Sequence, residues 1–179
     1  LYGLPSWGWA GADTFVINVL HFEQEGVEIP DPIGHETSME TYGEWARQFY
    51  IDGERFGLSF AFGEGPLAVL CRAFGGDLID AEGTKSLLLD NENSQAALRW
   101  LYALAVEDQV LPAQAAFPAA LLEGKITMDW GGSLNVRNFA RDIKDETIAK
   151  ASQGLMPTDA NGKFPSQMRG GTWNILQTS

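Results

Sequence analysis

The sequence has little cysteine and histidine, which limits the chemistry it can support. Cys71 is the only cysteine among 179 residues, so the chain cannot form an internal disulfide or a cysteine-based zinc cluster. The apolar run around Cys71 predicts a buried, inert thiol. Only two histidines occur, and His35-Glu36 lacks the second histidine of a metalloprotease helix motif. We therefore expect no metal site and no cofactor.

Basic residues are also scarce, since 12 lysines and arginines stand against 24 aspartates and glutamates. The formal net charge is −12 and the pI is near 4.4. Phosphates are bound through Lys/Arg patches, so this balance argues against nucleic acid or an anionic membrane as a partner. The basic residues between Arg137 and Lys150 alternate with acidic ones and indicate a solvated helix face. The acidic balance favours neutral or cationic ligands only weakly, because surface carboxylates need not face a binding site.

Long apolar runs are missing as well. No stretch reaches the roughly 18 apolar residues of a membrane-spanning helix. The opening Leu1-Tyr2-Gly3-Leu4-Pro5 has no initiating methionine, charged leader or apolar targeting segment, so we expect the chain to be a piece of a longer protein. Its length and its 45% apolar residues suffice for one domain with a core.

Motifs of nucleotide binding and hydrolysis are incomplete. Gly63-Glu64-Gly65 lacks the third glycine of a dinucleotide loop, and Gly124-Lys125 lacks the rest of a P-loop. No Gly-x-Ser-x-Gly elbow occurs. Residue types alone leave a glycosidase pair such as Glu64 with Asp129 open, although the spacing does not favour it.

Alternating strand and helix patterns predict an α/β domain. The predicted strands are 2–4, 14–20, 57–62, 126–130, 155–157 and 172–176. The predicted helices are a short turn at 22–25 and longer helices at 39–50, 66–74, 114–123 and 133–141, with a further one capped by Asn93 or Ser94. Loops are predicted at 6–11, 27–38 and 77–90, the last with a small hairpin.

Aromatic residues beside glycines are the strongest functional signal. Members of this group lie at predicted strand ends or in the adjoining loops: Trp7, Trp9, Phe62, Trp130 and Trp173. Ligands of open α/β sheets bind outside the carboxyl ends of the strands, so these corners are candidates for one cleft. An aromatic ring covers the C–H face of a sugar while carboxylates, amides and backbone N–H groups bond its hydroxyls. The alternative is that most of these rings are core, because tryptophan is mostly buried in proteins.

Several of these motifs occur in the order and spacing of one known group. The sequence resembles the extracellular solute-binding proteins, family 1, of carbohydrate ABC importers, which have the type 2 periplasmic-binding fold. The resemblance is carried by Tyr2-Gly3-Leu4-Pro5, the strand 14–20, Glu25-Gly26-Val27 with Pro30 and Pro32, Trp45, Phe74-Gly75-Gly76-Asp77, Trp100-Leu101, Glu123-Gly124-Lys125 with Met128, Trp130-Gly131, Leu155-Met156-Pro157 and Gly170-Gly171-Thr172-Trp173.

The resemblance implies that residues 1–179 form one lobe of a two-lobed protein, with a layered mixed sheet flanked by helices. Residues near 1–14 and 170–179 are expected close to the crossings between the lobes. The implied partners are a sugar or oligosaccharide, a membrane permease and the missing first lobe. The implied location is the periplasm or the extracellular face of a bacterial membrane, with lipid anchoring left open, and the implied role is not enzymatic.

Residues at the positions where this family lines its cleft are Trp7, Trp9, Phe62, Glu64, Gly65, Trp130, Gly131, Gly132, Gly171, Thr172 and Trp173. The sequence departs from the family pattern at Val19-Leu20-His21-Phe22, and Gly63-Glu64-Gly65 has no aromatic where a stacking ring is common. Phe62, or Trp7 with Trp9, is expected to replace it. Trp130 is expected to end a strand with its ring in the cleft, while Gly131-Gly132 turn the chain into a helix whose N-terminus faces the ligand.

Two other classes of function stay open. A carbohydrate-active enzyme or sugar-binding module would hydrolyse a glycoside or retain a polysaccharide. A sensor or adaptor lobe of the same fold would carry a signalling domain elsewhere in its gene.

Overall fold

The computed structural model of the chain describes residues 2–11, 13–30, 37–113, 119–132 and 167–175. Its body is built on a three-stranded sheet in the order β2-β4-β3, with strands β2 (Asp13–Ile17), β3 (Phe56–Phe60) and β4 (Ile126–Gly132). The central strand β4 runs antiparallel to β2 and parallel to β3. The predicted mixed sheet is therefore confirmed.

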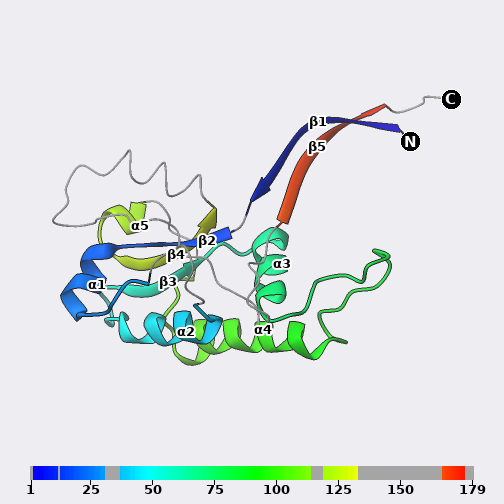
Figure 1. Cartoon of the computed structure of the whole chain (residues 1–179). Helices are drawn as coiled ribbons and strands as arrows, with labels where there is room; N and C mark the ends of the chain where they lie inside the picture. Colours follow the sequence, from blue (N-terminus) through cyan, green and yellow to red (C-terminus); the bar gives the residue numbers. More distant parts are fainter. Residues whose placement is uncertain (1, 12, 31–36, 114–118, 133–166, 176–179) are drawn as a thin grey trace.

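Alternation along the three strands builds the main core. Successive side chains of a strand point to opposite faces, so every second residue of this sheet shares one face. The buried hydrophobic residues of that face are Phe15, Ile17, Leu58, Phe60, Met128 and Trp130, and all belong to one cluster. Helices α2 (Met39–Gln48), α3 (Glu64–Ala73) and α4 (Glu92–Tyr102) lie on one side of the sheet, whereas the short α5 (Ala119–Leu122) lies on the other (Figure 1).

Polar caps fix where the helices begin. The Ser38 side chain accepts a hydrogen bond from the Thr41 amide at the start of α2. Asn91 accepts from the amides of Asn93 and Ser94 at the start of α4, so the cap lies two or three positions before the expected Asn93 or Ser94. Such caps satisfy backbone N–H groups that have no partner inside the helix. A π-helical turn, η1 (Ala103–Glu107), continues α4.

The Gly75-Gly76-Asp77 motif has a structural role at the end of α3. Gly75 has φ of 82°, a left-handed conformation that glycine adopts without steric cost. A Cβ atom on Gly76 would lie 2.4 Å from the Ser94 hydroxyl oxygen, so glycine is required for this close approach. Ser94 donates to the Asp77 carbonyl oxygen at 2.7 Å and accepts from the Asp77 amide at 3.1 Å. The motif thus ties the end of α3 to the start of α4.

His21 joins helix α1 (Val19–Glu25) to the sheet. The side-chain amide of Asn18 lies 3.3 Å from the His21 Nε2 atom, and Nδ1 lies 2.8 Å from the Thr127 hydroxyl. Because an amide nitrogen only donates, Nε2 accepts and the neutral ring donates from Nδ1. Burial, with a smaller effect from the charge of Arg55, lowers the pKa of His21 to about 4. His21 is therefore a neutral core residue, and His35 lies outside the described residues.

A second sheet rises from one end of the body as a two-stranded ribbon (Figure 1). Its antiparallel strands are β1 (Tyr2–Gly11) and β5 (Gln167–Ile175). The register pairs Tyr2 with Ile175 at the far end and Gly11 with Gln167 at the foot. We call this sheet the ribbon. Its foot adjoins the start of β2, since only one residue separates Gly11 from Asp13.

Most predicted elements are confirmed, with three corrections. The predicted loop 6–11 is wrong, because it forms part of the continuous strand β1. The strand predicted at 14–20 ends at Ile17, where Asn18 caps α1. The turn predicted at Gly131-Gly132 is also wrong, since both glycines extend β4 and pair with Thr14 and Asp13. The strand at 155–157 and the helix at 133–141 lie outside the described residues.

The expected burial of Cys71 is confirmed. Gly124 follows the end of α5 with φ of 70°, a conformation that suits glycine just past a helix end. No helix among the described residues is long and apolar enough to cross a membrane.

Replacing Gly57 by alanine is expected to destabilise the fold strongly. A Cβ atom at this buried position of β3 would lie 1.8 Å from the Ala46 carbonyl oxygen of α2, so helix and strand would have to separate. Overpacking of this kind costs about 3 kcal/mol. Urea unfolding should show this loss for Gly57→Ala.

Gly63→Ala is the matched control, because the nearest atom to its Cβ would be 3.8 Å away and its backbone is extended. The unfolding free energy of this variant should fall by no more than about 1 kcal/mol, the cost of alanine at a helix cap. Equal stabilities for the two variants would contradict the close contact of β3 with α2.

Candidate functional site at the carboxyl ends of β3 and β4

The site is positioned by the parallel pairing of β3 with β4. Phe60 lies opposite Trp130 in this register, so both strands end at the same edge of the sheet. Asp13, the first residue of β2, is opposite Gly132 at that edge. The carboxyl ends of parallel strands are where α/β sheets bind ligands. We call Phe62–Gly65 together with Gly131–Gly132 the rim.

Phe62 places an exposed aromatic ring on the rim. Phe62 lies two residues after Phe60, the last residue of β3, and its side chain is 60% exposed. The ring contacts Phe60 edge-on, with ring centroids 5.4 Å apart. Phe60 in turn is buried and lies 5.7 Å from the Trp130 ring. A row of packed rings therefore holds Phe62 at the surface, where more than half of its side chain is exposed.

The N-terminus of α3 adds hydrogen-bond donors beside this ring. Gly63 caps the helix and contributes no side-chain hydrogen bond. The amides of Glu64 and Gly65 belong to the first turn, where N–H groups have no acceptor inside the helix. Pro66 follows and has no N–H group. Glu64 and Gly65 thus present two amides next to Phe62.

Trp130 is buried, which corrects the expectation that its ring faces a cleft. Its side chain is 1% exposed and contacts Phe15 edge-on at 4.7 Å, in addition to Phe60. The cause is strand alternation, which directs Trp130 to the same face as Met128 and Phe15. Its indole nitrogen has no hydrogen-bond partner among the described residues. Trp130 supports the rim from below instead of forming its surface.

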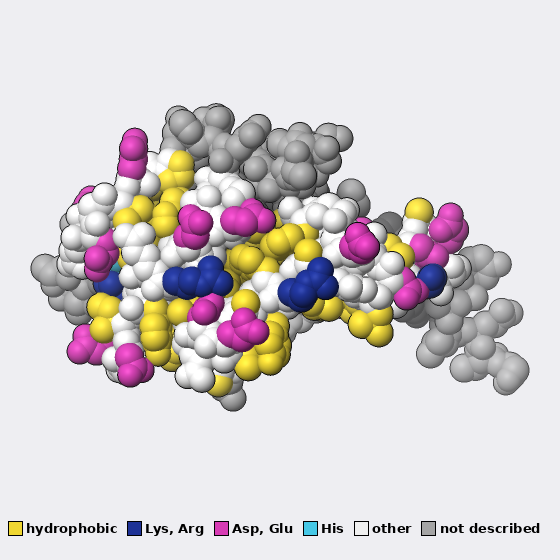
Figure 2. Space-filling model, turned by 90° about the horizontal axis from the view of Figure 1, so that it is seen from below, with side chains coloured by type: hydrophobic (Ala, Val, Ile, Leu, Met, Phe, Trp, Pro, Cys, Tyr) yellow, Lys and Arg dark blue, Asp and Glu magenta, His cyan; other side chains and the backbone are white. Residues whose placement is uncertain are grey.

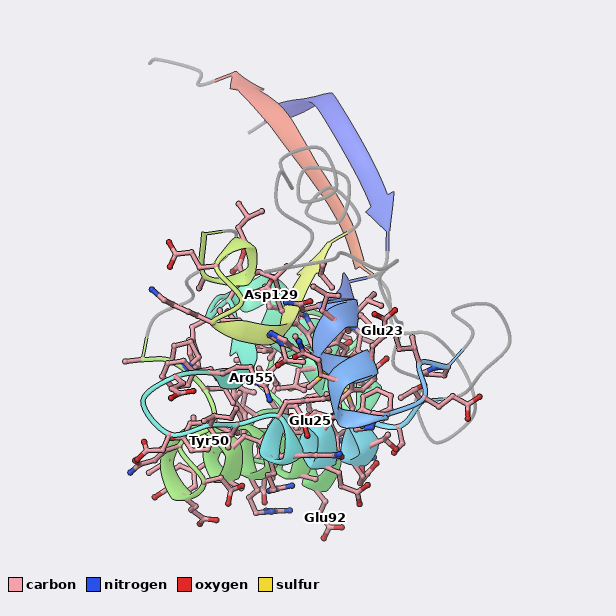
Figure 3. The ribbon with its side chains drawn as sticks, turned by 90° about the vertical axis from the view of Figure 1, so that its left-hand side faces the viewer. Glu23, Glu25, Tyr50, Arg55, Glu92 and Asp129 are labelled. Carbon is pink, nitrogen blue, oxygen red and sulfur yellow. The ribbon has the colours of Figure 1, made fainter. Side chains whose placement is uncertain are left out.

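Asp129 is a buried carboxyl group on the opposite face of β4. It is 2% exposed, and Ser59 lies opposite it in β3. Burial raises the pKa of the Asp129 carboxyl to about 7, while the neighbouring Ser59 hydroxyl offsets part of this rise. Figure 3 shows Asp129 on the side of the body nearest the ribbon. Because Glu64 is exposed and Asp129 is buried, this arrangement gives no support to a glycosidase pair.

The remaining predicted site residues lie on the ribbon. Trp7 pairs with Gly171, Pro5 with Thr172, and Leu4 with Trp173, whereas Trp9 lies nearer the foot opposite Arg169. The ribbon thus brings Trp7 and Gly171 side by side. Trp173 lies toward its far end, so the predicted residues form two groups, one on the rim and one on the ribbon.

Phe60 was not predicted as part of the site. Its position in a run of apolar residues marks it only as core, and its contact with Phe62 depends on how the chain leaves β3. The sequence indicates Asp129 only as one half of an open glycosidase pair with Glu64. Its raised pKa depends on burial between neighbouring strands, which residue type does not indicate.

Searches of the sequence against protein families and against curated proteins find no match. Its structure is similar to many solved structures, among them the ABC substrate-binding protein Lmo0181 from Listeria monocytogenes, in complex with cycloalternan (14% identity, TM-score 0.71, 97% of this chain and 44% of that chain). A solute-binding protein from Agrobacterium vitis with bound D-mannitol has 19% identity and a TM-score of 0.72 over 96% of this chain and 42% of its own. UgpB from Mycobacterium tuberculosis, in complex with glycerophosphocholine, has 15% identity and a TM-score of 0.71 over 91% of this chain and 41% of its own.

These similarities establish the fold. The chain has the α/β architecture of one lobe of the solute-binding proteins, as predicted, and it spans less than half the length of each of these neighbours.

The raised pKa of Asp129 predicts a pH-dependent stability. Between the ordinary aspartate pKa of 3.8 and the folded value of about 7, the folded chain binds more protons than the unfolded chain. The contribution of Asp129 to the unfolding free energy should therefore fall as the pH rises from about 4 to 7. Asp129→Asn removes this loss, so its stability relative to wild type should grow by on the order of a few kcal/mol over that range.

Urea unfolding at pH 4, 5.5, 7 and 8 measures this difference. Asp52→Asn, at an exposed position, is the control for loss of one carboxylate. A difference between Asp129→Asn and wild type that stays constant with pH would show that Asp129 is not held protonated by burial.

Proposed function

We propose that the chain is one lobe of the solute-binding component of an ABC importer and that its rim takes part in binding a sugar or polyol. The observation that carries this proposal is the exposed Phe62 ring beside the amides of Glu64 and Gly65, which have no hydrogen-bond acceptor among the described residues. These groups lie at the carboxyl ends of two parallel strands. An apolar surface next to a few fixed polar groups is the usual composition of a small-molecule site.

The rim matches the two chemical sides of a sugar. The C–H face of a pyranose or polyol packs on the Phe62 ring, while its hydroxyls accept from the two amides and donate to the Glu64 carboxylate. Gly131 and Gly132 carry no side chain, so the ligand can approach the backbone of β4 closely. Trp130 acts through Phe60 by holding this surface in place.

The rest of the natural protein supplies the second lobe in this proposal. The chain covers 41% to 44% of the three solved neighbours described above, which leaves room for a lobe of similar size. Residues 1–14 and 170–179 lie near the crossings between lobes. Trp7, Trp9, Gly171, Thr172 and Trp173 then contribute from the ribbon to a cleft that closes by hinge motion.

The bound solute is handed to a membrane permease on the outer side of the cytoplasmic membrane. The protein binds its ligand without turnover. The ligands named for the solved neighbours include an uncharged polyol, D-mannitol, and a phosphodiester, glycerophosphocholine. The fold alone therefore does not decide the charge of the ligand.

Phe62→Ala tests the site at the protein's full natural length. Loss of the stacking ring should weaken binding of the best ligand from a sugar and polyol panel by about tenfold, which corresponds to about 1.4 kcal/mol. Isothermal titration calorimetry measures the change in Kd.

Tyr102→Ala is the matched control, because Tyr102 is a similarly exposed aromatic residue, at 55%, on α4. Its Kd should equal that of wild type. Equal affinities for all three proteins would contradict a binding role for Phe62, and release of a hydrolysed product from any glycoside in the panel would contradict binding without turnover.

A further inference from the structure

The ribbon has two unlike faces. Residues directly opposite each other in an antiparallel pair share a face of the sheet, and the faces alternate along each strand. The register therefore assigns every paired residue of the ribbon to one of two faces. The first, which we call the aromatic face, consists of Tyr2, Leu4, Trp7, Trp9, Gly11, Gln167, Arg169, Gly171, Trp173 and Ile175. The second, which we call the opposite face, consists of Gly3, Pro5, Gly8, Ala10, Met168, Gly170, Thr172 and Asn174.

The compositions of the two faces differ sharply. Every aromatic residue of β1 and β5 belongs to the aromatic face, and Arg169, opposite Trp9, adds a cation to it. The opposite face has mainly small residues. Neither strand contains an acidic residue although the chain has 24, so the ribbon is set apart from the acidic surface of the protein. Aromatic residues with a few polar groups are typical of ligand sites, which indicates a binding role for one face of the ribbon.

A β-bulge in β1 keeps the aromatic residues together. The pairing shifts between Pro5 and Trp7, which leaves Ser6 as an extra residue in this strand. Positions 4 and 7 are an odd number of residues apart, so strict alternation would place Trp7 and Trp9 on the face opposite Leu4. The bulge takes up the extra residue, and Trp7 and Trp9 therefore lie on the same face as Leu4.

The foot of the ribbon adjoins the rim. Gly11 ends β1, and Asp13, which begins β2, is opposite Gly132 of the rim. Neither β1 nor β5 packs extensively against another helix or strand in the described part of the chain, and the ribbon rises away from the body (Figure 1). A ligand on the rim thus lies beside the foot of the aromatic face.

The far side of the body has no comparable grouping. On the face formed by α2 and α4, hydrophobic side chains lie among acidic and basic ones (Figure 2). Tyr102 is the exposed aromatic residue of α4, at 55%. This helix therefore provides a control for loss of an exposed ring away from the ribbon.

We propose that the ribbon contacts the solute through the aromatic face alone, and that the bulge at Ser6 keeps Trp7 and Trp9 on this face. The inference rests on the proposed function, since it concerns the same cleft. It narrows the part of the ribbon in that cleft, because Trp173 shares the aromatic face whereas Thr172 lies on the opposite face.

Two deletions in the protein at its full natural length separate the face from the bulge. Removing either Ser6 or Ala10 shortens β1 by one residue, so the pairing becomes regular and the bulge is lost. With the foot held at Gly11, deletion of Ser6 leaves Trp7 and Trp9 on the aromatic face, whereas deletion of Ala10 moves both to the opposite face. Both variants lose the twist and bend that a bulge adds, and they differ in the face that the two tryptophans occupy.

Isothermal titration calorimetry with the best ligand of the sugar and polyol panel measures the effect. The variant without Ser6 should bind at least about tenfold more tightly than the variant without Ala10, because it keeps two aromatic residues at the site. Circular dichroism checks that both variants fold. Equal Kd values for the two folded deletions would overturn the inference.

Substitutions that keep the strand length decide the case in which the deletions do not fold. Trp9→Ala should weaken binding about tenfold, and Trp9→Phe should restore most of the affinity. Met168→Ala, next to the foot on the opposite face, and Tyr102→Ala should bind as wild type does. Full affinity of Trp9→Ala, or an equal loss in Met168→Ala, would overturn the inference.

These outcomes are distinct from failure of the proposed function. If wild type binds a member of the panel and Phe62→Ala weakens that binding, the function stands whatever the ribbon variants show. If wild type binds no member of the panel, the proposed function and the role of the aromatic face are overturned together.

Discussion

The pairing of β3 with β4 is the constraint on which the candidate site depends. Because the two strands are parallel and Phe60 lies opposite Trp130, the chain leaves both strands at one edge of the sheet. The rings of Trp130, Phe60 and Phe62 then form a continuous contact from the core to the surface. A slip of this register by one residue would direct Trp130 to the opposite face and remove the support beneath Phe62.

The core between the sheet and the helices depends on the close approach of α2 to the sheet. Gly57 is the position at which β3 meets the backbone of α2, and Phe15 stacks on Tyr42 of the same helix with ring centroids 3.8 Å apart. These contacts hold the carboxyl ends of β3 and β4 in place without taking part in the rim. A dense core on one face of the sheet therefore leaves the strand ends free to carry a site.

The sequence predicts the arrangement of elements better than the direction of side chains. The predicted strands around Leu58 and Met128 follow from local rules and are confirmed. Local rules also account for the residues observed at helix boundaries, with Ser38 capping α2 and with Gly75 and Gly124 past helix ends. The predicted orientation of Trp130 is wrong. Two glycines after a tryptophan indicate a turn by local rules, but Gly131 and Gly132 pair with Thr14 and Asp13 and extend the strand. Phe62 is expected at the site only as a replacement for the stacking ring that is common in the family at Gly63-Glu64-Gly65. Its exposure does not follow from the sequence, because strand patterns do not show which side chain leaves the sheet. The raised pKa of Asp129 depends on cross-strand burial, which no local pattern reveals.

The central claim is that a polyhydroxylated ligand binds at the carboxyl ends of β3 and β4, against Phe62 and the first amides of α3. Hydrogen–deuterium exchange of the protein at full natural length, with and without a saturating sugar or polyol, tests this most directly. The account predicts that ligand slows exchange of the amides of Phe62, Gly63, Glu64 and Gly65 and leaves those of Arg55 and Lys125, at the opposite edge, unchanged. Protection confined to that opposite edge or to α4, with none at residues 62–65, would contradict it.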